Sequence, residues 1–390
     1  MGIYLDHAAT TYTDPKVLEV MLPYFTEDFG NASTPYGFGR KADKAISEAR
    51  EQVASVIGAA KDEIYFTSGG TESDNWAIKG AAETAGKGHI ITSSVEHHAV
   101  LDTCKYLEDK GFDVTYLPVD GKGMVTPQSV RNAIRPDTIL ISVMFANNEV
   151  GTIMPIREIG AVAKERGILF HTDAVQAVGH VPIDVSELGI DMLSMSAHKF
   201  YGPKGVGALY VRKGVNLGKF MHGGAQEKGS RAGTINTPGI VGLGAAIKLA
   251  ADTMEEGNTR EAALSKRLRD GLLEIPMSIL NGHESQRLPG NVNITFGGIE
   301  GEALMVYLDL EDIAVSTGSA CTSGSTKPSH VLLAMGVSIE DARGAIRFTL
   351  GRENTEKQID TVIEKTKSIV GKIREISPLF AQHKGGKKYV

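Results

Sequence analysis

A lysine at position 199 stands in surroundings that suit covalent chemistry. Lys199 follows His198 and precedes a turn rich in glycine and proline, and an apolar run at 190–195 predicts a buried strand before it. In open α/β sheets, ligands bind at the carboxyl ends of the strands, which is where this lysine would lie. A partly desolvated amine can lose its proton and attack an aldehyde, so Lys199 is a candidate Schiff-base nucleophile. Taken alone, a lysine before a turn is far more often a surface residue.

A glycine-rich turn follows another predicted strand, at 63–67. The sequence Ser-Gly-Gly-Thr at 68–71 leads directly into a predicted helix. Glycines let the backbone approach a phosphate closely, Thr71 adds a hydroxyl, and the helix N-terminus presents free N–H groups. A tight turn with a capping threonine explains the same residues about equally well. The chain has neither a P-loop motif nor a Gly-x-Gly-x-x-Gly that opens a helix after the first strand, which argues against a nicotinamide cofactor.

Two adjacent histidines, His97 and His98, end the predicted strand that starts at residue 89. Adjacent histidines are poorly placed to share one metal ion from either a strand or a helix. We therefore expect one of them to stack on an aromatic ring and the other to be structural.

Polar side chains also follow two more predicted strands. Asn148 comes after one of them, and Asp173 and Gln176 come at and after the end of the strand at 169–173. A carboxylate that faces a pyridine nitrogen keeps it protonated and makes the ring an electron sink. Asp173 alone could equally cap a helix, but the same chain offers Lys199 at the end of the next strand. Together these residues predict an enzyme that binds pyridoxal 5'-phosphate (PLP) through Lys199.

The composition is that of an ordinary globular protein. The chain has 390 residues, of which 42% are hydrophobic and 23% charged, so it is long enough for two domains. A net charge of -6 and a pI near 6.0 argue against a dedicated nucleic-acid binder. No apolar run reaches the roughly 18 residues that a membrane span needs, and the start does not resemble a signal peptide. We therefore expect a cytoplasmic protein that binds neither membranes nor nucleic acid.

Strand-like and helix-like segments alternate along residues 63–211, which is typical of a largely parallel sheet with right-handed crossovers. The seven predicted strands are 63–67, one that starts at 89, 113–117, 138–145, 169–173, 191–195 and 208–211. A helix at 239–256 is expected to lead into a second region, where short strands and further helices predict a smaller α+β domain. The fold class is therefore α/β, with a mostly parallel seven-stranded sheet in the larger domain. We expect that domain at 15–257, the small domain at 1–14 and 258–378, and a mobile tail at 379–390.

The two cysteines lie in very different segments. Cys104 belongs to a helical pattern with apolar residues at spacings of three and four, which predicts a packed thiol. Cys321 lies in a loop of glycine, serine and threonine at 316–326, which has little to pack and ample backbone freedom. This loop suits a thiol that visits a site and then leaves it, and an exposed cysteine in a flexible loop is an equally good interpretation of that segment alone.

Five short motifs occur together in this chain: Ser-Gly-Gly-Thr-Glu-Ser, Glu-His-His, the Asp173/Gln176 pair, Ser-Ala-His-Lys and Gly-Ser-Ala-Cys-Thr-Ser. In this combination the chain closely resembles the cysteine desulfurases of the class-V aminotransferase family, from about residue 4 to residue 351. The resemblance implies the fold type I of PLP-dependent transferases. The cysteine loop resembles the longer-loop branch, which serves iron-sulfur cluster assembly. Three residues depart from the usual pattern of the family: Ala225, Ile235 and Thr349. None of them is an expected catalytic residue.

The resemblance implies a role for each matching residue. Lys199 would hold PLP covalently and move the Cα proton of the substrate, while His97 would stack on the ring and serve as an acid and base. Asp173 would pair with the pyridine nitrogen, and Gln176 with the ring hydroxyl. The phosphate would be held by Gly70, Thr71, Ser196 and His198, with Thr234 of the partner subunit completing the site in a homodimer.

Substrate binding and sulfur transfer are also implied by the resemblance. Asn148, which is also expected to contact the cofactor, and Arg347 would bind the carboxylate of L-cysteine. Cys321 would attack the substrate sulfur and keep it as a persulfide, leaving alanine. The sulfur would then pass to an iron-sulfur scaffold protein. The persulfide on Cys321 could also ligate a transient [2Fe-2S] cluster shared with that scaffold.

Two other functions fit parts of the sequence. A related PLP lyase that acts on selenocysteine or cysteine sulfinate could share the cofactor site, but it would not absolutely require Cys321. A catalytically idle protein with the same fold that only binds a partner would be expected to lack catalytic groups. Here Lys199, His97, Asp173 and Cys321 are all present, so we favour the desulfurase.

Overall fold

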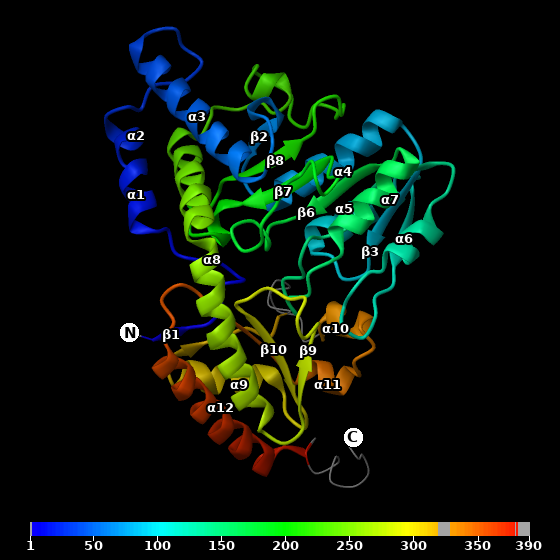
Figure 1. The fold of residues 1–390 in the computed structure, drawn as a ribbon, viewed down its shortest axis with the longest axis vertical. Helices are drawn as coiled ribbons and strands as arrows, with labels where there is room; N and C mark the ends of the chain where they lie inside the picture. The colour runs from blue at the N-terminus through cyan, green and yellow to red at the C-terminus, as the bar shows by residue number, and fades with distance from the viewer. Residues whose placement is uncertain (1, 319–327, 379, 381–390) are drawn as a thin grey trace.

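The computed structural model describes residues 2–318, 328–378 and 380. Its larger lobe is built on a seven-stranded sheet with the order β2-β8-β7-β6-β5-β3-β4 (Figure 1). In chain order these strands are β2 (Ile64–Thr67), β3 (His89–Ser93), β4 (Asp113–Leu117), β5 (Thr138–Ser142), β6 (Leu169–Asp173), β7 (Met192–Ser196) and β8 (Gly207–Val211). β3 to β7 pair in parallel, whereas β8 is antiparallel to both β7 and β2. The predicted mostly parallel seven-stranded sheet is confirmed.

Helices cover both faces of this sheet. α4 (Gly70–Ala85) and α5 (His98–Glu108) share a core with one face, around Trp76 and Ile90. The other face packs against α3 (Gly37–Val56), α7 (Ile156–Arg166) and the first half of α8 (Thr237–Leu273), around Phe170 and Leu243. Consecutive strand residues such as Ile90 and Ile91 point into opposite cores, because side chains alternate along a strand. Cys104 is fully buried in the first of these cores, as predicted for a packed thiol.

Short helices complete the larger lobe. α1 (Pro15–Met21) begins after Asp14, whose carboxylate accepts a hydrogen bond from the N–H of Lys16 at 2.9 Å, and Pro15 occupies the first helical position. The other two are α2 (Pro23–Thr26) and α6 (Pro127–Ala133), of which α6 packs beside α7.

The smaller lobe has an antiparallel sheet of three strands, β12 (Ala345–Thr349), β10 (Asn291–Phe296) and β9 (Ser278–Asn281). A second, parallel pair joins β1 (Ile3–Tyr4) to β11 (Ile313–Ala314) and so ties the N-terminus to this lobe. The helices here are α9 (Gly301–Asp309), α10 (His330–Ala334), α11 (Ile339–Arg343) and α12 (Glu356–Ile376). α12, α9 and the second half of α8 enclose a separate core that includes Leu268, Phe348 and Val370.

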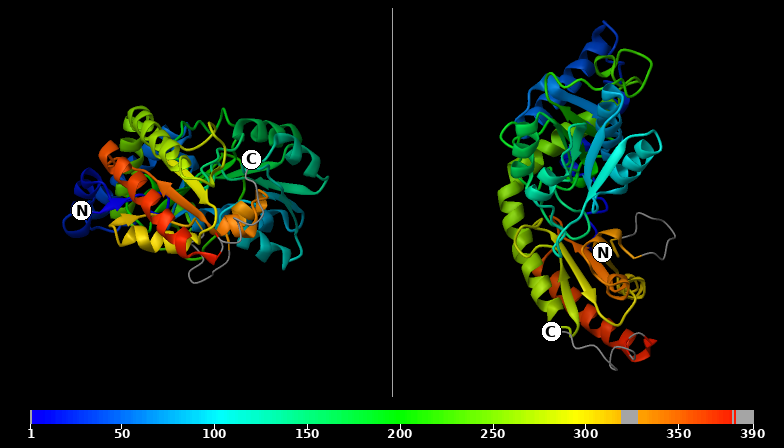
Figure 2. Two further views of the ribbon diagram at one scale, coloured as in Figure 1. Left: turned by 90° about the horizontal axis from the view of Figure 1, so that it is seen from below. Right: turned by 90° about the vertical axis from the view of Figure 1, so that its right-hand side faces the viewer.

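α8 connects the two lobes as one continuous helix of 37 residues (Figure 2). The sequence pattern predicted a helix at 239–256 and a further helix from about 259, and the structure instead joins them without a break. The reason lies in packing, because Leu243 and Ile247 are buried in the larger core while Leu264 and Leu268 are buried in the smaller one. The predicted domain boundary at 257/258 falls inside this helix, and the division into two domains stays a prediction.

Among the helices that the structure describes, none combines the length and the apolar character needed to cross a membrane.

Candidate active site

A cavity of about 260 Å³ lies at the carboxyl ends of the central strands. β6 ends at Asp173, and β7 ends at Ser196 and continues into a single turn of 3-10 helix, Ala197–Lys199, which carries the lysine. The predicted site residues that line this cavity are Gly70, Thr71, His97, Asn148, Asp173, Gln176, Ser196, His198, Lys199 and Arg347. Of the remaining predictions, Thr234 is exposed and does not line the cavity, and Cys321 lies outside the described residues.

One corner of the cavity fits a phosphate. β2 leads through Gly69, whose φ of 156° favours glycine, into the N-terminus of the 16-residue helix α4. A Cβ at Gly70 would come within 2.5 Å of Val175 Cγ2, so a larger residue here would force Val175 to shift. The free N–H groups of the helix, with the hydroxyls of Thr71 and Ser196 beside them, make a donor set that suits a phosphate monoester. The residues present therefore fit the phosphate of PLP.

His198 also lines this cavity, and its imidazole is held by contact between Nδ1 and the hydroxyl of Thr10 at 3.1 Å. Burial, together with the positive charge of Lys199, lowers the pKa of His198 to about 4. His198 is therefore neutral at pH 7 and can act there as a hydrogen-bond donor.

The amine of Lys199 is held by the N-terminal segment. Lys199 Nζ donates to the carbonyl oxygens of Ala8 and Ala9, the second at 2.8 Å. The Ala8 carbonyl also accepts from Gln176 Nε2 at 3.0 Å, and the Ala8 N–H donates to Thr349 Oγ1 at 2.9 Å. No motif in the sequence pointed to this N-terminal segment. Its small residues carry no chemical group that could have pointed to a place in the site.

His97 caps the start of α5. Its Nδ1 accepts a hydrogen bond from the N–H of Ala99 at 3.1 Å, so the neutral ring carries its proton on Nε2. Burial lowers the pKa of His97, against the opposing effect of Asp173. The ring is thus a neutral, fixed plane on one wall of the cavity, as stacking on a cofactor ring would require.

Two carboxyl groups, those of Asp173 and Asp74, line the cavity. Asp173 Oδ1 accepts from the N–H of Val175 at 2.9 Å. Burial raises the pKa of Asp173, while the nearby His97 and Lys199 work in the opposite direction. Asp74 was missed by the sequence analysis, although it stands on the buried face of α4 four residues after Gly70, where an apolar residue would be expected.

Arg347 reaches the cavity from β12 of the smaller lobe. Its Nη1 donates to the Asn148 carbonyl and its Nη2 to Asp6 Oδ1, both at 2.8 Å, and the residue is only 4% exposed. Within the described residues, Arg347 Nε has no hydrogen-bond partner although it is buried. A guanidinium group held in this way can offer its remaining donor to a carboxylate. Asp6 is a second residue that the sequence analysis did not single out.

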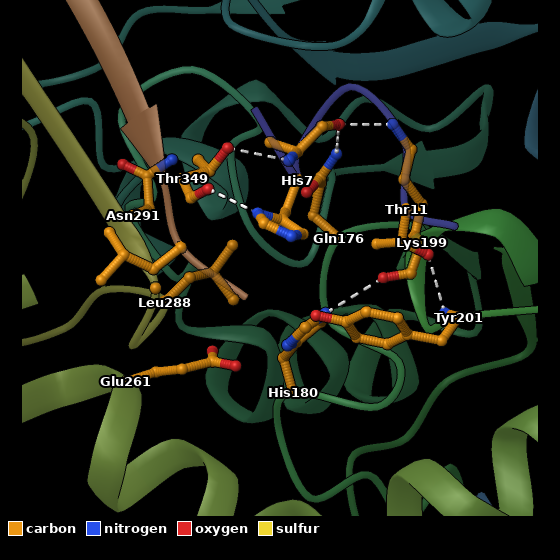
Figure 3. Close-up of a pocket in the computed structure, with 13 residues that line it drawn as sticks. His7, Thr11, Gln176, His180, Lys199, Tyr201, Glu261, Leu288, Asn291 and Thr349 are labelled. Atoms are coloured by element: carbon orange, nitrogen blue, oxygen red, sulfur yellow. Dashed lines mark hydrogen bonds between the residues drawn. The ribbon is translucent and has the colours of Figure 1, made fainter. Parts of the chain in front are cut away.

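A second, smaller cavity of about 40 Å³ lies beside the first, between the two lobes (Figure 3). Ala8, Gln176 and Lys199 border both cavities. The smaller cavity also contains the carboxyl group of Glu261, which comes from α8 and points inward in Figure 3. Burial raises the pKa of Glu261 to about 7. Here His180 Nε2 donates to the carbonyl of Lys199 at 3.3 Å.

Comparison with known proteins agrees with this geometry. The family model "Aminotransferase class-V" matches residues 3–362. "Cysteine desulfurase IscS" of Methanosarcina thermophila is 59% identical over 97% of this chain and 94% of its own length, and the protein of that name from Clostridium botulinum is 56% identical over 99% and 98%. Among solved structures, a "NIFS-LIKE PROTEIN" superposes with a TM-score of 0.90 at 41% identity, covering 95% of this chain and 100% of that one. "SspA in complex with cysteine" superposes with a TM-score of 0.81 at 42% identity, covering 90% and 100%.

The chain therefore belongs to the class-V aminotransferase family and, within it, to the cysteine desulfurases. Membership of this family implies PLP as the cofactor, in agreement with the phosphate-binding corner and the lysine described above.

Proposed function

We propose that this chain is a PLP-dependent desulfurase that converts L-cysteine to L-alanine and transfers the sulfur to Cys321 as a persulfide. The observation that carries the proposal is the convergence of Lys199, Asp173, His97 and Arg347 on one cavity that also has a phosphate-binding corner. These groups come from both lobes and from four separate segments of the chain.

The cofactor would be held by groups of three kinds. The N-terminus of α4, Thr71, Ser196 and His198 would bind the phosphate. His97, Asp173, Gln176 and Asn148 would contact the ring. Lys199 would form the covalent link. When bound, PLP supplies an electron sink for the electrons released at the Cα of an amino acid.

The remaining steps would be carried by the protein's own side chains. Arg347 and Asn148 would hold the substrate carboxylate, so that the Cα–H bond faces Lys199 Nζ, which takes up the proton. Cys321 would attack the substrate sulfur as a thiolate, forming an S–S bond while the Cβ–S bond breaks. The electron pair left on the substrate would then be protonated to give alanine, with His97 and Lys199, which both line the cavity, as the proposed donors.

The first test is the visible spectrum of the purified protein before and after addition of L-cysteine, with alanine and sulfide assayed in the presence of a thiol reductant. We expect a yellow protein whose absorption band shifts, and equal amounts of the two products. A protein that shows no visible band even after PLP is added would overturn Lys199 as the anchor. A Cys321→Ala variant with full activity on L-cysteine would overturn the transfer step and favour a lyase for selenocysteine or cysteine sulfinate.

We also propose a homodimer, in which Thr234 of the partner subunit completes the phosphate site. The proposal is supported by a group of exposed apolar side chains near the N-terminus: Tyr12, Leu18, Val20, Leu22, Phe25, Phe29, Tyr36 and Phe38. Two of them, Phe29 and Phe38, have ring centroids 5.7 Å apart, and contiguous exposed apolar surface is typical of a protein interface. Sedimentation of the purified protein tests this, and a monomer that retains PLP and activity would contradict it.

The sulfur acceptor is proposed to be an iron-sulfur scaffold protein, with the cytoplasm as the location because a free thiol must stay reduced there. A [2Fe-2S] cluster bound through Cys321 would need ligands from the scaffold, since the described part of the chain contains no group of three residues that could hold a metal ion. Unchanged cluster transfer by a Cys321→Ser variant would argue against such ligation.

A further inference from the structure

Three buried carboxyl groups interact at the larger cavity, which two of them, Asp74 and Asp173, line. Asp74 belongs to α4, Glu96 precedes α5, and Asp173 ends β6; they are 1%, 0% and 6% exposed. Burial favours the neutral form of each group, and the negative charge on any one of them disfavours ionisation of the other two. Which of the three is ionised therefore depends on the partners that surround each one.

Asp173 is the carboxyl group with partners for a negative charge. It accepts a backbone hydrogen bond from Val175, and the positive charge of Lys199 acts to stabilise its ionised form. It also lines the cavity at the end of the strand that precedes the lysine.

Asp74 has no comparable cation. The basic group nearest to it in the described structure is His171, whose Nε2 lies 3.6 Å from Asp74 Oδ1. Both ring nitrogens of His171 already contact serine hydroxyls, at 2.9 Å for Ser142 and 3.0 Å for Ser194. Burial lowers the pKa of His171 to about 3, so this ring is neutral at pH 7. The Ser194 side chain favours ionised Asp74, but burial and the charge of Asp173 outweigh it, so the pKa of Asp74 is raised. Asp74 Oδ1 has no hydrogen-bond partner within the described residues.

Glu96 is satisfied on one oxygen only. Its Oε1 accepts from Ser93 Oγ at 2.6 Å and from the N–H of Met144 at 2.9 Å. Its Oε2 is buried and has no partner in the part of the chain that the structure describes. Burial raises the pKa of Glu96 to about 8 in spite of these two hydrogen bonds.

Within the described residues, the charged and titratable groups that face this cluster come from four segments. β6 contributes Asp173 and His171, the segment before α5 contributes Glu96 and His97, and the turn after β7 contributes His198 and Lys199. Arg347 of β12 also lines the cavity, but its Nη2 is paired with Asp6. Lys199 and the neutral imidazoles can therefore compensate one buried negative charge but not three, because a buried charge without a partner is costly.

We propose that the three carboxyl groups carry a single negative charge, on Asp173, and that Asp74 and Glu96 keep their protons at neutral pH. As neutral acids, Asp74 and Glu96 support the cavity floor without adding charge to it. In the proposed desulfurase, on which this consequence rests, they are positioning residues that leave Asp173 as the one anion opposite the ring nitrogen. This arrangement follows the general pattern in which neighbouring carboxyl groups in different surroundings lose their protons at very different pH values.

The experiment measures the infrared C=O stretch of protonated carboxyl groups at pH 7, a band that carboxylates lack. We expect Asp74→Asn and Glu96→Gln each to lose the equivalent of one group per chain, and Asp173→Asn to lose none. The matched control is Glu165→Gln, which removes an exposed carboxylate paired with Arg131 and should leave the band unchanged. If either Asp74→Asn or Glu96→Gln folds and leaves the band unchanged, the proposal is wrong. Having two variants keeps the test decisive if one of them fails to fold.

A second readout separates this proposal from the proposed function. In the PLP-loaded protein, the pH midpoint of the visible band should move by about one unit or more in Asp173→Asn and by less than about 0.3 unit in Asp74→Asn, because only the first removes a charge. An equal shift in both variants would show that Asp74 is ionised and would overturn the proposal. A protein that takes up no PLP would refute the desulfurase function, while the infrared result would still decide the charge state.

Discussion

The two cavities that share Lys199 bury acidic groups in opposite ways. The larger one faces the strand ends, and its Asp173 has the positive charge of Lys199 as an electrostatic partner. The smaller one lies between the lobes, and burial dominates at its Glu261, although His7 and Arg260 lower the pKa to some extent. The difference shows that burial alone does not decide the charge of a carboxyl group. In the part of the chain that the structure describes, Lys199 works against the effect of burial at Asp173, whereas burial outweighs the cations around Glu261.

The largest expected effect tests Lys199, one of the residues common to both cavities. Lys199→Ala should lower the rate of alanine formation by at least about 10³-fold, because the variant loses both the covalent anchor and the group that moves the proton. Lys204→Ala is the matched control, since Lys204 Nζ also binds the N-terminal segment, at the Thr11 carbonyl 3.0 Å away, but does not line either cavity. Comparable losses in both variants would mean that the lysines act only by holding that segment.

A smaller effect is expected at the substrate end of the larger cavity. Arg347→Lys should lower kcat/KM for L-cysteine by about 10²-fold, mostly through KM, because lysine cannot reproduce the fork of donors that binds a carboxylate. Steady-state kinetics measures this. Arg374→Lys provides the comparison, since Arg374 is also buried in the smaller lobe but donates to the Gly297 carbonyl. An unchanged KM in Arg347→Lys would remove this residue from substrate binding.

Glu261 in the smaller cavity should make the stability of the folded protein depend on pH. The pKa of Glu261 rises from 4.5 to about 7 on folding, so the folded state holds a proton that the unfolded state releases in this range. The stabilisation from this proton is complete below pH 4.5 and is lost as pH rises through about 7. The free energy of unfolding falls by roughly 3 kcal/mol at most over this range. Glu261→Gln should therefore unfold at higher denaturant concentration than the wild type at pH 8, and the difference should be absent at pH 4.5.

Glu256→Gln is the control on the same helix, because Glu256 is exposed. Its effect on denaturant unfolding should be small at both pH values. A Glu261→Gln variant that is less stable than the wild type at pH 8 would mean that the wild-type carboxylate finds a partner in the cavity.

The smallest effect concerns the wall between the cavities. Thr349→Ser keeps the hydroxyl that accepts from the Ala8 N–H and should change activity less than about twofold, whereas Thr349→Val should lose about 1 kcal/mol of stability. Thermal unfolding measures the stability of each variant, and the rate of alanine formation measures its activity. If Thr349→Ser were as damaging as Thr349→Val, the methyl group and not the hydrogen bond would be the important feature.

The sequence alone predicted the parts of the site that depend on local pattern. Lys199, Asp173 and Thr71 each follow a short apolar run, and the ends of parallel strands meet at one edge of a sheet, so their convergence could be expected. The same pattern could not predict the strand order β2-β8-β7-β6-β5-β3-β4 or the reversed direction of β8. Strand pairing joins segments that lie far apart in the sequence, so local spacing does not determine it.

Residues without a local pattern became visible only in the tertiary structure. Ala8 and Ala9 enter the site through their carbonyl oxygens, which every residue has, and Asp6 enters through an ion pair with Arg347, which is 341 residues away in the sequence. α8 is continuous because two separate cores bury its two halves, and no short stretch of sequence shows which core will bury which half. Residue types and local spacing determined the chemistry that this chain can carry. Packing between distant segments decided which acidic groups lie beside a cation, and hence where the negative charge belongs.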